Sequence, residues 1–171
     1  MNYNKLQDTD VDMKNEKGVW IGDPCYVVPE ELWGSFCNAW MAYEKKHEDL
    51  PRCYIAETHD EYSGRGFYSW STAYGDGCFQ LYVNNEPVAK LGVDAGCLAA
   101  IPVELLDEWR ERYELGDFEG LGHVVESEHL HGEIVMDGGD LFWGDVRLPT
   151  GGCVDDEEDE YAECEEEGFF C

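Results

Sequence analysis

Apolar positions along this 171-residue chain follow two different periods. One stripe recurs every three or four residues and consists of Leu32, Trp33, Phe36, Trp40 and Tyr43. This spacing predicts a helix over about residues 29–48, because side chains three and four apart share one helix face. A second stripe at the same spacing follows Pro102 and predicts another helix that ends near Gly116.

Short apolar runs separated by turn residues make up most of the remaining pattern and predict about eight strands. The eight strand runs cover 18–21, 53–56, 67–73, 78–83, 88–93, 122–126, 132–136 and 141–148, and a further short apolar run covers 97–101. Asn84-Asn85 and the Asp137–Asp140 segment are typical of hairpin turns. Two helices and many short strands predict an α+β fold with a strongly bent, barrel-like sheet.

The composition divides the chain into three parts. Residues 1–17 are polar and predict a flexible arm, and residues 18–150 predict a single α+β domain. Residues 151–171 are expected to form a disordered acidic tail, because a block of like charges repels itself. Its acidic residues are Asp155, Asp156, Glu157, Glu158, Asp159, Glu160, Glu163, Glu165, Glu166 and Glu167.

The net charge limits the classes of partner. The chain has 39 Asp and Glu against 11 Lys and Arg, which gives −28. Direct binding to nucleic acid or to an anionic membrane is excluded, since both need a basic surface. Neither a signal peptide nor an apolar membrane span is present in the sequence, so we expect a cytoplasmic protein.

Eight cysteines are present, and none of them forms a C-x-x-C pair. In a chain without an export signal we expect free thiols rather than disulfides. The missing pair spacing also argues against a structural zinc site, and the sequence predicts no cofactor.

Aspartates beside glycines offer a candidate cation or ligand site. Asp23, Asp76 and Asp94 supply the oxygens that hard cations prefer, although aspartate more often caps its own turn. Further candidates are Cys25 as a nucleophile and Arg65 as an anion-binding residue, together with the nearby tyrosines Tyr26 and Tyr74. We interpret Cys25 as a buried, inert thiol, because an acidic chain disfavours the thiolate.

Two further groups of residues leave alternatives open. His123, His129 and His131 lie near Glu126, Glu128 and Glu133, and two imidazoles with a carboxylate suit a transition metal. The polar character of this segment favours a solvated loop without metal. The aromatic residues between positions 54 and 82 are typical of a core, or of an aromatic mouth that holds a flat ligand.

Three short motifs occur in order, namely Gly22–Tyr26, Ala73–Gly77 and Gly92–Gly96. With these motifs the chain resembles uncharacterised proteins of tailed phages and bacteria and is similar to a bacterial domain of unknown function. The resemblance implies a phage or bacterial cytosolic protein and implies no catalytic residue. The segments that begin at Asp23 and at Asp94 are loosely similar in sequence, a similarity that we call the internal echo. It suggests either a duplicated half-domain or the same type of turn used twice.

These observations predict a non-enzymatic, phage-type accessory protein. We expect it to bind and block a basic, nucleic-acid-binding host protein through an acidic surface that imitates nucleic acid, in an anti-defence role. The alternative is a domain that sequesters a small molecule or a cation in an aromatic-lined barrel pocket. A thiol or metal hydrolase fits the sequence least well.

Overall fold

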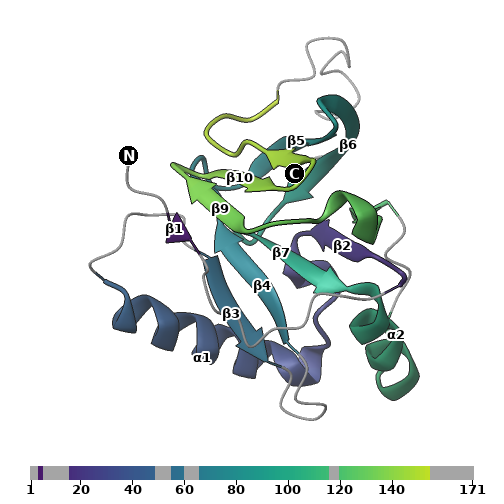
Figure 1. Cartoon of the computed structure of the whole chain (residues 1–171). Coiled ribbons are helices and arrows are strands. Elements are labelled where there is room, and N and C mark those ends of the chain that lie inside the picture. Colours follow the sequence, from purple (N-terminus) through teal and green to yellow (C-terminus); the bar gives the residue numbers. More distant parts are fainter. Residues whose placement is uncertain (1–3, 6–15, 49–54, 60–65, 116–119, 155–171) are drawn as a thin grey trace, which may run out of the picture.

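The computed structural model describes residues 4–5, 16–48, 55–59, 66–115 and 120–154. In these residues two α-helices and two antiparallel sheets build an α+β fold, as the sequence predicts (Figure 1). The helices are α1 (Glu30–Lys46) and α2 (Val103–Arg112), and the 3-10 turns are η1 (Pro24–Tyr26) and η2 (Ser127–His129).

Eleven strands form the two sheets within the described ranges. One sheet has the order β1-β9-β10-β11-β5-β6, with bounds Asn4–Lys5, Ile134–Asp137, Asp140–Trp143, Val146–Leu148, Gly77–Val83 and Glu86–Val93. The other has the order β3-β4-β7-β2-β8, with bounds Ile55–His59, Gly66–Ser71, Cys97–Pro102, Val19–Gly22 and Gly122–Val125. Both sheets are open at their edges, so the strands do not close into one barrel.

The five-stranded sheet is the middle layer of the molecule. Successive side chains of a strand point to opposite faces, and in β2 both directions are buried. Val19 and Ile21 face the six-stranded sheet, whereas Trp20 packs against the helices. Both α-helices therefore lie on one side of the molecule and the six-stranded sheet lies on the other (Figure 1).

The two α-helices begin in the same way. Pro29 and Pro102 stand just before their first turns, where a missing N–H costs no helical hydrogen bond. Acidic residues occupy each first turn and basic residues each last turn, which suits the helix dipole. Leu32 and Phe36 of α1 and Trp109 of α2 complete the core beneath the middle sheet. Neither α-helix of the described chain is long and apolar enough to cross a membrane.

The predicted hairpins are confirmed at two turns and corrected at a third. Asn84 and Asn85 have φ values of 52° and 63°, as a type I′ turn between β5 and β6 requires. Antiparallel β9 and β10 are joined at Gly138-Gly139. The single strand expected over 141–148 is wrong: Gly144-Asp145 forms a turn, and the segment folds back as β10 and β11.

Other expectations meet the structure only in part. Asn4–Lys5 of the predicted arm pairs with β9 as strand β1, and the rest of 1–15 lies outside the described residues. The predicted tail from residue 155 onward also lies outside them. The internal echo is repeated only in part: both segments run from an aspartate turn to a proline before an α-helix, but Asp23 leads into η1 whereas the segment after Asp94 is strand β7.

Candidate functional site

The Asp23 carboxylate is fully buried and binds three backbone N–H groups. Its Oδ1 accepts from the amide of Cys25 at 2.8 Å, which caps η1. Its Oδ2 accepts from the amides of Asp94 at 2.7 Å and Ala95 at 2.9 Å. A single side chain thus ties the turn after β2 to the turn between β6 and β7, which lies about 70 residues further along the chain.

The groups around Asp23 are held in their neutral forms. Burial, together with the nearby Asp23 carboxylate, raises the pKa of the Cys25 thiol well above its usual range. Burial also raises the pKa of Cys97 to about 12, again with Asp23 as a neighbouring charge. The hydroxyl of Tyr26 donates to Asp94, and burial followed by this bond raises the pKa of Tyr26. A thiol held protonated is a poor nucleophile.

The structure therefore brings together part of the candidate ligand site. Asp23, Cys25, Tyr26 and Asp94 are neighbours, and an Oδ of Asp76 lies 3.7 Å from where a Cβ on Gly96 would stand. The oxygens of Asp23 point at backbone amides, which favours turn capping over cation binding. Tyr74 is 59% exposed and packs edge-on against Phe79, while Arg65 lies outside the described residues.

The central aromatic residues belong to the cores. Phe67, Tyr68, Trp70 and Phe79 are at most 2% exposed. Tyr68, Trp70 and Phe79 lie between the two sheets, whereas Phe67 packs under the helices. These four side chains do not line an open mouth, which favours the core interpretation over an aromatic ligand pocket.

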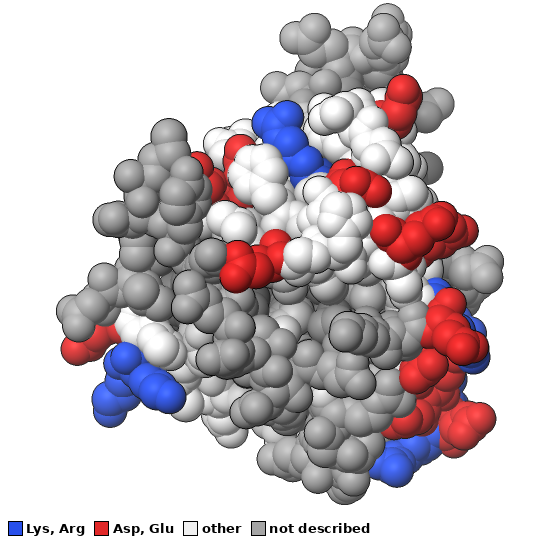
Figure 2. Space-filling model, viewed as in Figure 1, with Lys and Arg blue, Asp and Glu red and all other residues white. Residues whose placement is uncertain are grey.

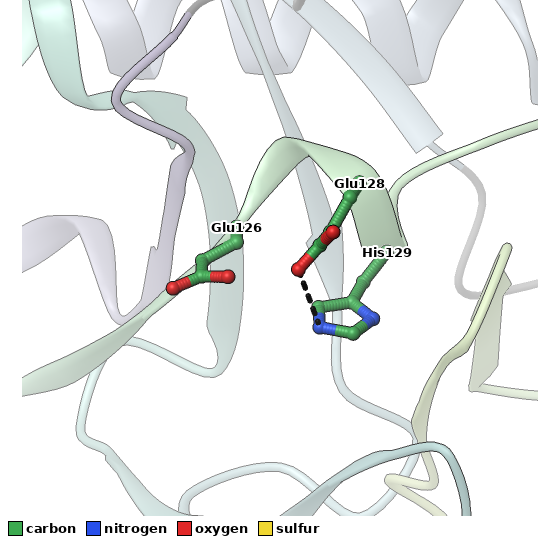
Figure 3. A group of neighbouring side chains, drawn as sticks. All are labelled: Glu126, Glu128 and His129. Atoms are coloured by element: carbon green, nitrogen blue, oxygen red, sulfur yellow. Dashed lines mark ion pairs between the residues drawn. The ribbon is translucent and has the colours of Figure 1, made fainter.

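A second group of polar side chains lies at η2, which is far from Asp23 in the sequence. One ligand atom each of Glu126, Glu128 and His129 falls within 4.8 Å of the others (Figure 3). Glu126 and Glu128 are exposed, while His129 is half-buried. Nε2 of His129 lies 3.8 Å from a carboxylate oxygen of Glu128. Carboxylate and imidazole groups at this spacing are able to share one cation.

Asp145 lies between two of the histidines and organises this group. Its Oδ2 is 3.0 Å from Nδ1 of His129, and its Oδ1 is 3.2 Å from Nε2 of His131. The hydrogen bond to Asp145 raises the pKa of His129. The bonds to His129 and then His131 lower the pKa of Asp145. His123 stands apart in β8 opposite Ile21, and burial lowers its pKa.

Backbone contacts fix Asp145 against η2. Its amide donates to the carbonyl of His129 at 2.9 Å, and its own carbonyl accepts from the amide of Asn84 at 3.0 Å. Gly144 has a φ of 57°, and a Cβ there would stand 2.4 Å from the carbonyl oxygen of His129. Only glycine permits this approach, so the turn between β10 and β11 is built to lie on the η2 segment.

Asp145 is the residue that sequence reasoning missed. The sequence pattern predicts one apolar strand over 141–148. A residue in the middle of this strand is not expected to contact the loop that carries the histidines. The available signal was the Gly144-Asp145 pair between apolar residues, since Gly-Asp is typical of a two-residue hairpin turn. The acidic tail residues 155–167, predicted to contact a partner, lie outside the described residues.

Comparisons with protein-family models, with curated proteins and with solved structures found no match for this chain. The resemblance to phage and bacterial proteins therefore stays a prediction.

Proposed function

We propose that this protein is a non-enzymatic binding protein that occupies the basic surface of a nucleic-acid-binding partner. The observation that carries the proposal is the charge of the folded part itself. Segments 16–48, 66–115 and 120–154 hold 20 Asp and Glu against seven Lys and Arg. The acidic excess is therefore a property of the domain and not only of the tail.

Acidic side chains lie on several parts of the visible face, and the densest group follows the edge that carries α2 (Figure 2). A few basic side chains interrupt this group. Within 103–115 and 120–133 the chain has eight acidic residues and two arginines. Lys17 neutralises part of this edge through its 2.7 Å ion pair with Asp107.

Such a charge exceeds what solubility requires. A small domain needs a net charge of only about 2 to 8 in magnitude to stay dispersed. Further like charges repel one another and oppose the compact state, so they carry a cost that a function has to offset. A dense acidic surface offers a DNA-binding protein the same sign of charge as a row of phosphates and attracts it over a long range.

The contacts of the candidate nucleophile and of the histidines argue against thiol-dependent catalysis. Its cysteine is the thiol that the sequence offered as a nucleophile, and its raised pKa keeps it protonated. The two histidines beside Asp145 bind this carboxylate and not a thiol or hydroxyl. The phage-type accessory role and an anti-defence effect are the biological setting that we propose for such an inhibitor.

The test combines capture from a lysate with kinetics on the purified partner. Capture at low salt should yield a basic DNA-binding protein, and DNA should compete for it. Association should slow as salt rises, because charges are screened over about 8 Å at physiological ionic strength. Deletion of 155–171 removes ten acidic residues and no basic one, and should slow association if the tail steers the encounter.

Two matched variants locate the binding surface. One carries glutamine at four glutamates in or just after α2, namely Glu104, Glu108, Glu111 and Glu114. The control carries glutamine at four glutamates in or just after α1, namely Glu30, Glu31, Glu44 and Glu48. Both change the net charge equally, and the α2 variant should associate on the order of ten-fold more slowly than the control. Equal effects, or binding that resists salt and ignores DNA, would contradict the proposal.

A further inference from the structure

We propose that Glu126, Glu128 and Nε2 of His129 form a binding site for one divalent first-row transition-metal ion. One ligand atom from each residue already lies within 4.8 Å of the others, and Nε2 of His129 is 3.8 Å from a carboxylate oxygen of Glu128. They come from the short segment that enters and forms η2, so the local backbone alone brings them together (Figure 3). This inference is independent of the acidic binding role proposed above.

The imidazole distinguishes this group from the many acidic pairs on the surface. Carboxylates alone suit Mg²⁺ and Ca²⁺, whereas an imidazole nitrogen favours ions such as Co²⁺, Ni²⁺ and Zn²⁺. The Glu126 side chain is available, because it makes no cap hydrogen bond to η2. Glu128 is also exposed, so both carboxylates are able to rotate toward a common point.

The required movement is small. Donors that each lie about 2.0–2.2 Å from a metal are themselves about 3–3.5 Å apart. The present separations are at most 4.8 Å, so none has to shrink by more than about 1.3–1.8 Å. Rotation of two exposed glutamate side chains supplies this without moving the backbone.

Asp145 gives His129 the orientation that a metal ligand needs. Metal-binding histidines ordinarily donate their second ring N–H to a carboxylate, which fixes the tautomer and turns the other nitrogen toward the metal. Here Nδ1 of His129 faces Asp145 at 3.0 Å, and Nε2 faces the Glu128 carboxylate at 3.8 Å. Asp145 is thus a positioning residue rather than a ligand.

This support comes from a different element and is fixed independently of the glutamates. Asp145 lies on the turn between β10 and β11, and its amide binds the carbonyl of His129. The close approach depends on Gly144, whose missing side chain leaves room for the η2 backbone. His131 holds the second oxygen of Asp145, which stops the carboxylate from swinging into the metal position.

Three protein donors leave at least one coordination position for water or for a small anion. The ion would also reduce the local negative charge of the η2 segment. The site that we infer is therefore an open one, able to bind a further oxygen ligand from solution or from a partner.

Co²⁺ titration followed by visible absorption is the test, because the spectrum reports the donor atoms. Excess Mg²⁺ is present throughout to occupy carboxylates that lack a nitrogen neighbour. We expect one equivalent of Co²⁺ to bind, with a spectrum of nitrogen and oxygen ligands. A sulfur-to-cobalt charge-transfer band would assign the ion to cysteines and overturn the proposal.

Four variants sharpen the result. Glu128→Gln and His129→Gln should each weaken Co²⁺ binding by at least about ten-fold, because each removes a donor. Their controls are Glu86→Gln in the β5–β6 hairpin and His47→Gln at the end of α1, which should leave binding unchanged. Binding that survives His129→Gln, or no stoichiometric binding above the Mg²⁺ background, would overturn the site.

Asp145→Asn tests the positioning role. It should lower the Co²⁺ affinity by about ten-fold while the one-to-one stoichiometry remains. The unfolding temperature of the metal-free variant separates this effect from simple loss of structure. Unchanged affinity per folded molecule, with only a lower unfolding temperature, would show that Asp145 is merely structural.

Discussion

Asp23 and Asp145 both follow a glycine in a turn, and both tie their turn to a distant segment. Asp23 is buried completely and accepts hydrogen bonds from three backbone amides. Asp145 has a side chain that is 31% exposed and contacts two imidazoles. A Gly-Asp pair therefore holds backbone segments together in the first region, which we call the framework. In the second region, which we call the adjustable region, it orients side chains that are able to change partner.

The nature of the partner groups explains the difference. A backbone N–H does not change its role with pH and offers a metal no lone pair, so the amide partners of Asp23 stay the same when protons or metal ions bind elsewhere. An imidazole exchanges its proton and has a second nitrogen that is free for another partner. Capping by Asp23 thus contributes to stability, whereas the imidazoles held by Asp145 are able to exchange protons and to bind a further partner.

The largest effect is expected from Asp23→Ala. The change leaves the amides of Cys25, Asp94 and Ala95 without their acceptor, and should lower the free energy of unfolding by about 3 kcal/mol. Chemical denaturation measures this. The control is Asp76→Ala, an exposed aspartate beside the same turn, which should change stability by less than about 0.5 kcal/mol. Equal losses in both variants would contradict a framework role for Asp23.

Gly144→Ala should have the next largest effect. The new Cβ would stand 2.4 Å from the His129 carbonyl oxygen, and residue 144 has a positive φ. We expect a loss of about 2 kcal/mol, from backbone strain together with the forced separation of the turn from η2.

Gly96→Ala is the matched control from the Asp23 region. Its φ of 66° resembles that of Gly144, but the nearest atom to its added Cβ is 3.7 Å away. Only the conformational cost should remain, at about 1 kcal/mol. If Gly96→Ala lowered the free energy of unfolding as much as Gly144→Ala, the close approach of the turn to η2 would not be the cause of the Gly144→Ala effect.

The sequence predicted the framework better than the adjustable region. Helical stripes, the prolines before both helices and the Asn84-Asn85 turn identified elements whose cause is local. The capping role of Asp23 was also foreseen, because aspartate in a Gly-Asp-Pro turn binds nearby amides. Its bonds to Asp94 and Ala95 were not foreseen, since they depend on how β6 and β7 meet β2.

The Asp145 cluster was missed for a different reason. Apolar residues on both sides of Gly144-Asp145 hid the turn, because they predict a strand over the whole segment when the Gly-Asp pair is passed over. His129 and His131 were singled out as possible metal ligands, but their partner was placed on a strand. The layering of two sheets was also beyond the sequence, because alternation shows which face is apolar and not what covers it.

The third prediction concerns thiol chemistry in the Asp23 region. Folding raises the pKa of Cys97 from 9.0 to about 12, so its native thiol should react with iodoacetamide at least ten-fold more slowly than in the unfolded chain. From about pH 7 to pH 10 the native rate should keep rising, whereas the unfolded rate levels off above the ordinary thiol pKa.

The same pKa shift makes the stability of the protein depend on pH. Because Cys97 has a higher pKa in the folded protein than in the unfolded chain, its contribution to the free energy of unfolding is present below pH 9 and declines as the pH rises toward about 12. Mass spectrometry of the alkylated peptide gives the rates. Asp23→Asn removes a neighbouring charge and should speed native alkylation, while Asp137→Asn, on the far hairpin, should not. Equal native and unfolded rates would refute the assignment.

The smallest effect is expected from Tyr26→Phe. The change removes only the hydroxyl that donates to Asp94 and leaves the buried Asp23 contacts to the backbone intact. Because Asp94 is exposed, water replaces the lost donor, and the free energy of unfolding should fall by only about 0.5 kcal/mol. Denaturation of the single variants and of Tyr26→Phe with Asp94→Asn checks whether the two residues act through one bond. A loss as large as that of Asp23→Ala would place the Tyr26 bond, rather than the amide clamp, at the centre of the framework.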